Sequence, residues 1–285
     1  MSAPAPGTAT TVKPRPGLPG IAAAFLRRDF VEAASYRLAF ALRCFGFAVG
    51  LLTVFFTARF INLSRNPLLT PYGGDYFAFS LVGLILMDFQ YVAVGAFSSR
   101  IRNAQTQGTL EAILATPAPL PAVLVAAPLY DFAAATLRAV LYLTVGALVF
   151  GIRLHHANVL AVAVTGVLAL VAFVSLGLCA GAFTLLVRRG DPINLFLGGV
   201  SMLAGGVWYP SQALPGWLAR LGDLLPITHA LEATRRSLLV GAGIGELARP
   251  LGALAILCVV FAPLGLVLFR IALRRAREDG SLTHY

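Results

Sequence analysis

Four ionisable side chains interrupt long apolar stretches of this chain and are the first candidates for chemistry: Arg43, Asp88, Asp131 and Arg138. A charge at the centre of a bilayer costs at least about 2.5–3.5 kcal/mol, so such groups pair with one another or face water. Asp131 and Arg138 are seven residues apart and share a helix face. The four could line a substrate path or relay protons, or they could form interhelical ion pairs that hold the helices together.

The composition indicates that these charges belong to a membrane protein. Hydrophobic residues make up 58% of the chain and charged residues only 12%, whereas soluble domains carry about 25% charged residues. The net charge is +10, but the arginines lie beside apolar stretches instead of on one polar domain. This distribution favours membrane topology over nucleic-acid binding.

The apolar stretches predict an all-α integral membrane protein with six transmembrane helices, because a spanning helix needs about 20 apolar residues. The predicted spans are 38–61, 76–98, 122–150, 159–187, 193–209 and 251–273. The predicted organisation is a disordered tail at 1–20, one transmembrane domain at 21–275 and a second tail at 276–285. Residues 21–36 form either an N-terminal interfacial helix or an extension of the first span. In the fourth span, Gly177 and Gly181 form a G-x-x-x-G pattern suited to close helix packing.

The arginines also predict the topology. With six spans, the basic residues that lie on one side of the membrane are Lys13, Arg15, Arg27, Arg28, Arg37, Arg100, Arg102, Arg188, Arg189, Arg270, Arg274, Arg275 and Arg277. The other collects Arg59, Arg65, Arg153, Arg220, Arg235, Arg236 and Arg249. Because basic residues favour the cytoplasmic side, both termini and the polar segment 102–117 are predicted to be cytoplasmic.

Two connections carry patterns of their own. In 102–117, Leu110, Ile113 and Leu114 make one apolar stripe before Pro117 stops the helix, so the segment is either a solvated connector or a docking surface. Between spans five and six, two half-length amphipathic patterns meet at Pro226, and Glu232 lies four residues before Arg236. That region is either an external re-entrant hairpin or a pair of helices on the membrane surface.

Both connections resemble signatures of the ABC-2 type transporter permeases. Residues 108–117 read GTLEAILATP, similar to the family's GTLE-x-x-L-x-T/S-P. Residues 205–218 and 225–235 read GGVWYPSQALPGWL and LPITHALEATR, similar to its second signature. The resemblance implies an ATPase-coupling helix formed by Gly108, Thr109, Leu110, Glu111, Ile113, Leu114 and Pro117. It implies an external hairpin that includes Tyr209, Pro210, Pro215, Trp217, Pro226, Glu232 and Arg235.

The resemblance further implies a function. The chain would be the permease subunit of an ATP-driven exporter in a bacterial plasma membrane, paired with a second permease copy, identical or not, and with ABC ATPase subunits. Its cargo would be a lipid, a glycolipid or polysaccharide, or a drug-like amphiphile. ATP and Mg would bind to the ATPase, because Lys13 is the only lysine and no phosphate-binding loop exists. We expect no catalytic, cofactor or metal residues here. The alternative is an ion-coupled secondary transporter in which Asp88 and Asp131 carry protons.

Overall fold

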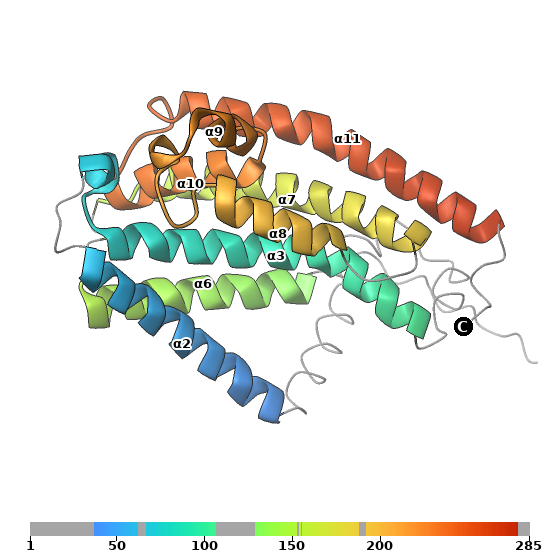
Figure 1. The fold of residues 1–285 in the computed structure, drawn as a ribbon, viewed down its shortest axis with the longest axis horizontal. Coiled ribbons are helices and arrows are strands. Elements are labelled where there is room, and N and C mark those ends of the chain that lie inside the picture. Colours follow the sequence, from blue (N-terminus) through green and yellow to red (C-terminus); the bar gives the residue numbers. More distant parts are fainter. Residues whose placement is uncertain are drawn as a thin grey trace, which may run out of the picture.

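The computed structural model describes residues 37–61, 67–106, 129–152, 154, 156–187 and 192–278, and within these ranges the chain forms only helices and turns. Long helices run side by side along the molecule, and the first one slants away from the others (Figure 1). They are α2 (Arg37–Ile61), α3 (Tyr76–Thr106), α6 (Leu129–Phe150), α7 (Val159–Val187) and α11 (Ala248–Glu278). This all-helical architecture agrees with the prediction from the sequence.

Four of these helices contain segments long and apolar enough to cross a membrane. The segments are Tyr76–Ser99 in α3, Tyr130–Phe150 in α6, Val159–Leu185 in α7 and Ala248–Arg275 in α11. The first and fifth predicted spans correspond to shorter apolar helical segments, Ala48–Ile61 and Ile193–Ala204. Six spans therefore remain a prediction, while four have both the required length and the required hydropathy in the described part of the chain.

The fifth span ends earlier than predicted. Helix α8 (Pro192–Ala204) stops five residues before the predicted limit at 209, and residues 205–210 continue without helical structure. Gly206 adopts φ +73°, a left-handed conformation that glycine takes without strain, so the helix cannot continue through it. Because residues 205–209 are mostly apolar, the sequence analysis had extended the span through them. The predicted tails, the segment 21–36 and residues 107–117 lie outside the described residues.

Short elements gather at one end of the bundle, which we call the hairpin end (Figure 1). They are η1 (Pro67–Tyr72), η2 (Ser211–Ala213), α9 (Gly216–Gly222), α10 (Pro226–Arg235) and η3 (Arg236–Val240). Pro226 begins α10 as its first residue, where the missing proline N–H is not needed. At the other end of the bundle, the far end, α3, α7 and α11 finish.

Helix α3 is the centre of the bundle and contacts α2, α6, α7, α8 and α10. Its side chains include the fully buried Phe79 and Leu81. The approach to α7 is very close at Gly177, because an added Cβ would lie 2.2 Å from the carbonyl oxygen of Ala93. The G-x-x-x-G pattern thus marks internal packing of α7 on α3 at its first glycine, as small residues permit in membranes.

Candidate functional site

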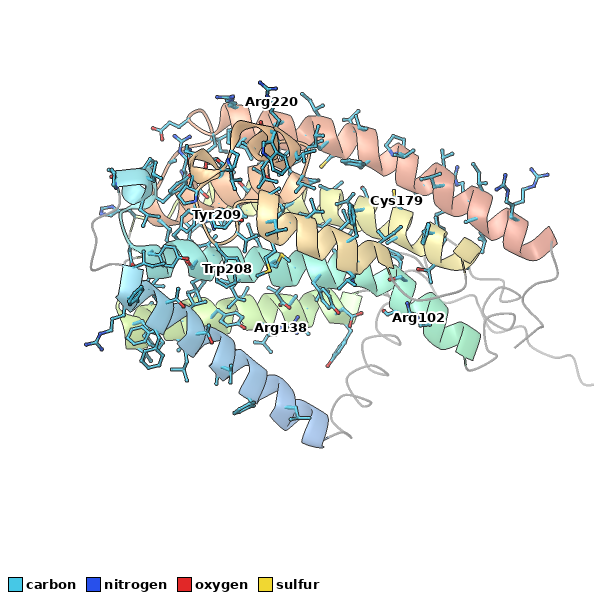
Figure 2. All side chains as sticks on the ribbon, in the orientation of Figure 1. Arg102, Arg138, Cys179, Trp208, Tyr209 and Arg220 are labelled. Carbon is cyan, nitrogen blue, oxygen red and sulfur yellow. The ribbon has the colours of Figure 1, made fainter. Side chains whose placement is uncertain are left out.

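Asp88 of α3 and Arg138 of α6 form an ion pair inside the bundle. Arg138 donates from Nε to Asp88 Oδ2 at 2.8 Å and from Nη2 to Asp88 Oδ1 at 3.2 Å, a two-pronged geometry. Each residue lies twelve positions from the hairpin end of its helix, about 18 Å at 1.5 Å per residue. Their side chains remain 29% and 33% exposed (Arg138 is labelled in Figure 2). A partly exposed charge pair therefore lies near the middle of the predicted membrane.

The sequence analysis named two further intramembrane charges, Asp131 and Arg43. Arg138 contacts Asp88 on the neighbouring helix α3. Asp131 lies seven residues before Arg138 on α6 and is half-buried. The side chain of Arg43 lies outside the described residues. Two tyrosines flank the pair: Tyr142 is buried one turn from Arg138, and Tyr91, three positions after Asp88, is 62% exposed.

A second polar contact joins α3 to α8. Gln90 donates from Nε2 to Ser201 Oγ at 2.7 Å, and both side chains are buried. One turn further along α3, Gly95 leaves room for the buried Asn194, whose Nδ2 lies 2.9 Å from where a Cβ would be. The sequence analysis missed this contact because it considered only ionisable groups. A glutamine within an apolar span was the available signal, since buried polar groups need a partner.

Arg235 fastens the hairpin to α3 and to the end of α8. Its side chain is 3% exposed and donates to the carbonyl oxygens of Phe79 at 3.1 Å, Gly206 at 2.7 Å and Val207 at 2.7 Å. Gly83 allows this approach, because a Cβ there would lie 2.3 Å from the Val207 oxygen. The end of α8 at Ala204 leaves the Gly206 and Val207 carbonyls outside any helix, and the Arg235 guanidinium supplies donors to both.

Glu232, one turn before Arg236 on α10, connects the hairpin to η1. Tyr72 donates its hydroxyl to Glu232 Oε2 at 2.5 Å, and Arg236 Nη1 lies 4.0 Å from Glu232 Oε1, the i,i+4 pair that the sequence predicted. Burial and the hydrogen bond to Glu232 raise the pKa of Tyr72 to about 12, so the phenol is a neutral donor at physiological pH. Burial lowers the pKa of Arg235 to about 9, which leaves its guanidinium charged at neutral pH.

The remaining residues of the predicted hairpin lie around this connection (Trp208, Tyr209 and Arg220 are labelled in Figure 2). Tyr209 donates its hydroxyl to the Leu203 carbonyl at 2.5 Å, and Pro210 is buried. Pro215 precedes α9, from which Trp217 projects with 67% of its surface exposed. Leu221 of α9 and Leu224, two residues after the end of this helix, are also exposed. An apolar face turned outward fits contact with a membrane, whether the hairpin dips into it or lies on it.

The predicted coupling residues Gly108–Pro117 lie outside the described residues. The helix that leads to them is described: α3 is continuous from Tyr76 to Thr106 and ends one residue before this segment. No group of three or more His, Cys, Asp or Glu side chains with a metal-binding arrangement occurs in the described part of the chain.

Apolar helices of spanning length, polar contacts between them and a hairpin at one end define a multi-pass membrane protein. Residues 24–239 match the ABC-2 type transporter family, which covers most of the chain and both signatures. The chain therefore belongs to the ABC-2 type transporter family. Members are membrane subunits of transporters, not themselves catalytic, and normally work with an ABC ATPase. No curated protein matches the chain.

Proposed function

We propose that this chain is the permease subunit of an ATP-driven exporter, that it functions as a pair of permeases, and that separate ATPase subunits dock on residues 108–117. The far end of the bundle faces the cytoplasm in this proposal, since Arg102, Arg270, Arg274 and Arg275 lie towards that end. The nucleotide and its Mg bind to the ATPase, and the cargo is a lipid, a glycolipid or polysaccharide, or a drug-like amphiphile.

The observation that carries the proposal is the position of α3. This helix extends for 31 residues, about 46 Å, from the segment that resembles the coupling helix to the contacts of Arg235 at the hairpin end. Arg235 bonds the first turn of α3 at Phe79, and Tyr76 donates to the Trp208 carbonyl at 2.9 Å. A push on the far end of α3 would therefore reach the hairpin without passing through a flexible connection.

Helix α8 is the element that α3 would move against. Within one chain, α8 is attached to α3 through Gln90 and Ser201, and its exposed face carries Leu195 and Phe196, which are 81% and 68% exposed. Two permeases that face each other across α8 would enclose a path lined by apolar side chains. ATP-driven closure of the ATPases would shift α3 of one copy against α8 of the other, and an amphiphile would leave below the hairpin.

The test reverses the charge of the predicted docking surface. The variant Glu111→Lys with Leu114→Asp changes the charge and removes one apolar contact, worth about 1.5–3 kcal/mol when buried. We expect normal membrane insertion, weaker co-purification of the ATPase from native membranes, and loss of transport-coupled ATP hydrolysis. The matched control is Glu246→Lys, which makes the same charge reversal at an exposed position of the hairpin end. If the double variant retains ATPase binding and export at the control's level, residues 108–117 are not the coupling segment.

A further inference from the structure

An open apolar groove of about 300 Å³ lies between α7 and α11. Helix α7 lines it with side chains from Leu170 to Leu178, and α11 lines it with Ala262 and Leu266. The hydroxyl of Ser175 points to its own helix, since it donates to the Val171 carbonyl at 2.6 Å. Val171 and Leu266 are each 42% exposed. The groove is therefore accessible from outside the bundle and offers no polar partner.

The groove lies near the middle of the two spanning segments, which are Val159–Leu185 in α7 and Ala248–Arg275 in α11. At that depth the surroundings of a membrane protein are lipid acyl chains. Water and polar molecules are excluded from a site that cannot form hydrogen bonds with them. An occupant of this groove is thus a hydrocarbon chain.

The two ends of the groove differ. Towards the hairpin end, Cys258 of α11 contacts α7 through a hydrogen bond from Sγ to the Leu168 carbonyl at 3.2 Å. Towards the far end, Arg270 follows Ala262 and Leu266 in steps of four, so the three lie along one side of α11. Arg270 is exposed and lies about 6 Å beyond Leu266 along the helix. Its long side chain can extend to the headgroup level, since half of the hydrocarbon core is about 15 Å.

We propose that this groove and Arg270 bind one anionic phospholipid of the leaflet at the far end. One acyl chain lies between α7 and α11 with its end near the midplane, and the phosphate pairs with the Arg270 guanidinium. Guanidinium groups bind phosphate oxygens in a two-pronged geometry, and basic residues beside membrane helices attract anionic lipids. The lipid is a resident part of the structure and not the exported cargo.

Native mass spectrometry of the purified full-length chain tests this site. The protein is incubated with equal amounts of phosphatidylglycerol and phosphatidylcholine that carry the same acyl chains, and the retained lipids are counted. We expect one phosphatidylglycerol molecule to be retained preferentially. Arg270→Gln should weaken its binding about fivefold, the effect of one arginine at an anionic membrane surface. The matched control, Arg275→Gln, removes an exposed arginine from the opposite side of α11 and should leave binding unchanged.

A second pair of variants tests the groove itself. Ala262→Phe fills it and should abolish retention of the lipid. Val267→Phe adds the same ring at a position that is 50% exposed and outside the groove, and should not affect retention. Equal retention of the two lipids by the unmodified protein, equal effects of Arg270→Gln and Arg275→Gln, or full retention by Ala262→Phe would each overturn the proposal. The two arginine variants change surface residues, so they test binding of the anionic lipid even if Ala262→Phe does not assemble. None of these measurements depends on the ATPase or on the direction of transport.

Discussion

The guanidinium carbon of Arg235 lies 3.4 Å from the centre of the Phe79 ring, while its Nε donates to the backbone carbonyl of the same phenylalanine. One side chain of the hairpin thus contacts one residue of α3 through both its aromatic face and its main chain. A cation over an aromatic face adds about 2 kcal/mol or more when both groups are desolvated. This relationship makes the first turn of α3 and the hairpin a single unit.

Replacing Arg235 should therefore destabilise the hairpin end strongly. Arg235→Met keeps much of the volume but leaves the Gly206 and Val207 carbonyls without this donor, at a cost of about 1–3 kcal/mol for each unpaired group. We expect a markedly lower melting temperature of the purified protein. The adjacent Arg236→Met is the control, because Arg236 is half-exposed and lies 4.0 Å from Glu232, a contact worth less than about 1 kcal/mol. Equal melting temperatures for the two variants would contradict the role assigned to Arg235.

The glycines of α7 provide a second comparison within one helix. An added methyl group at Gly177 would lie 2.2 Å from the Ala93 carbonyl oxygen, whereas the space around Gly166 is open to 4 Å. Gly177→Ala should separate α7 from α3 and cost about 1–3 kcal/mol, the usual range for overpacking. Gly166→Ala should be neutral or stabilise the helix by up to about 1 kcal/mol. Melting temperatures of both variants check this, and a stable Gly177→Ala protein would show that the packing relaxes.

Much of the helical architecture could be predicted from the sequence because apolar length and helical periodicity are local properties. The spacing of Glu232 and Arg236 predicted their contact for the same reason. The end of α8 could not be predicted from local patterns, since residues 205–209 are apolar enough to continue a span. The left-handed conformation of Gly206 is what stops the helix from continuing.

Contacts between helices were harder to predict, because one sequence does not give their rotation and register. Asp131 and Arg138 share a helix face, yet Arg138 pairs with Asp88, 50 residues away. The sequence analysis counted Arg235 as a basic residue of an external connection and, through the family resemblance, as a residue of the hairpin, but it did not predict its partners. Two of its acceptor carbonyls, those of Gly206 and Val207, are available because α8 ends at Ala204, so these bonds could not be predicted before that helix end was known.

The proposed orientation leads to a topology prediction. Gln107 should be cytoplasmic and Ser211, in η2 at the hairpin end, should be external. In a cysteine-free background, an impermeant thiol reagent applied to whole cells should label Ser211→Cys and spare Gln107→Cys. Labelling of both variants after the membrane is permeabilised is the control for reactivity. Labelling of Gln107→Cys alone in intact cells would invert the orientation and place the arginine-rich far end outside.

The Asp88–Arg138 pair distinguishes an ATP-driven permease from a proton-coupled transporter. If the pair is structural, Asp88→Asn leaves Arg138 without a counter-charge in the membrane, at a cost of up to about 2.5–3.5 kcal/mol, and lowers the amount of assembled protein. The double variant Asp88→Asn with Arg138→Gln removes both charges and should recover most of that loss. The amount of assembled protein is compared with that of Asp131→Asn, which removes an acidic side chain from the same helix as Arg138 but leaves Asp88 in place.

The functional arm of this experiment uses proteoliposomes that contain the permease and its ATPase. The double variant should still export its cargo with ATP, and an imposed proton gradient alone should drive no export. A proton carrier predicts the reverse, because an aspartate that moves protons cannot be replaced by asparagine even when its partner charge is removed as well. Gradient-driven export without ATP that is lost in Asp88→Asn would therefore favour the secondary transporter. The two hydrogen bonds from Arg138 to Asp88, at 2.8 and 3.2 Å, support the structural role, since they hold both carboxylate oxygens of α3 against α6.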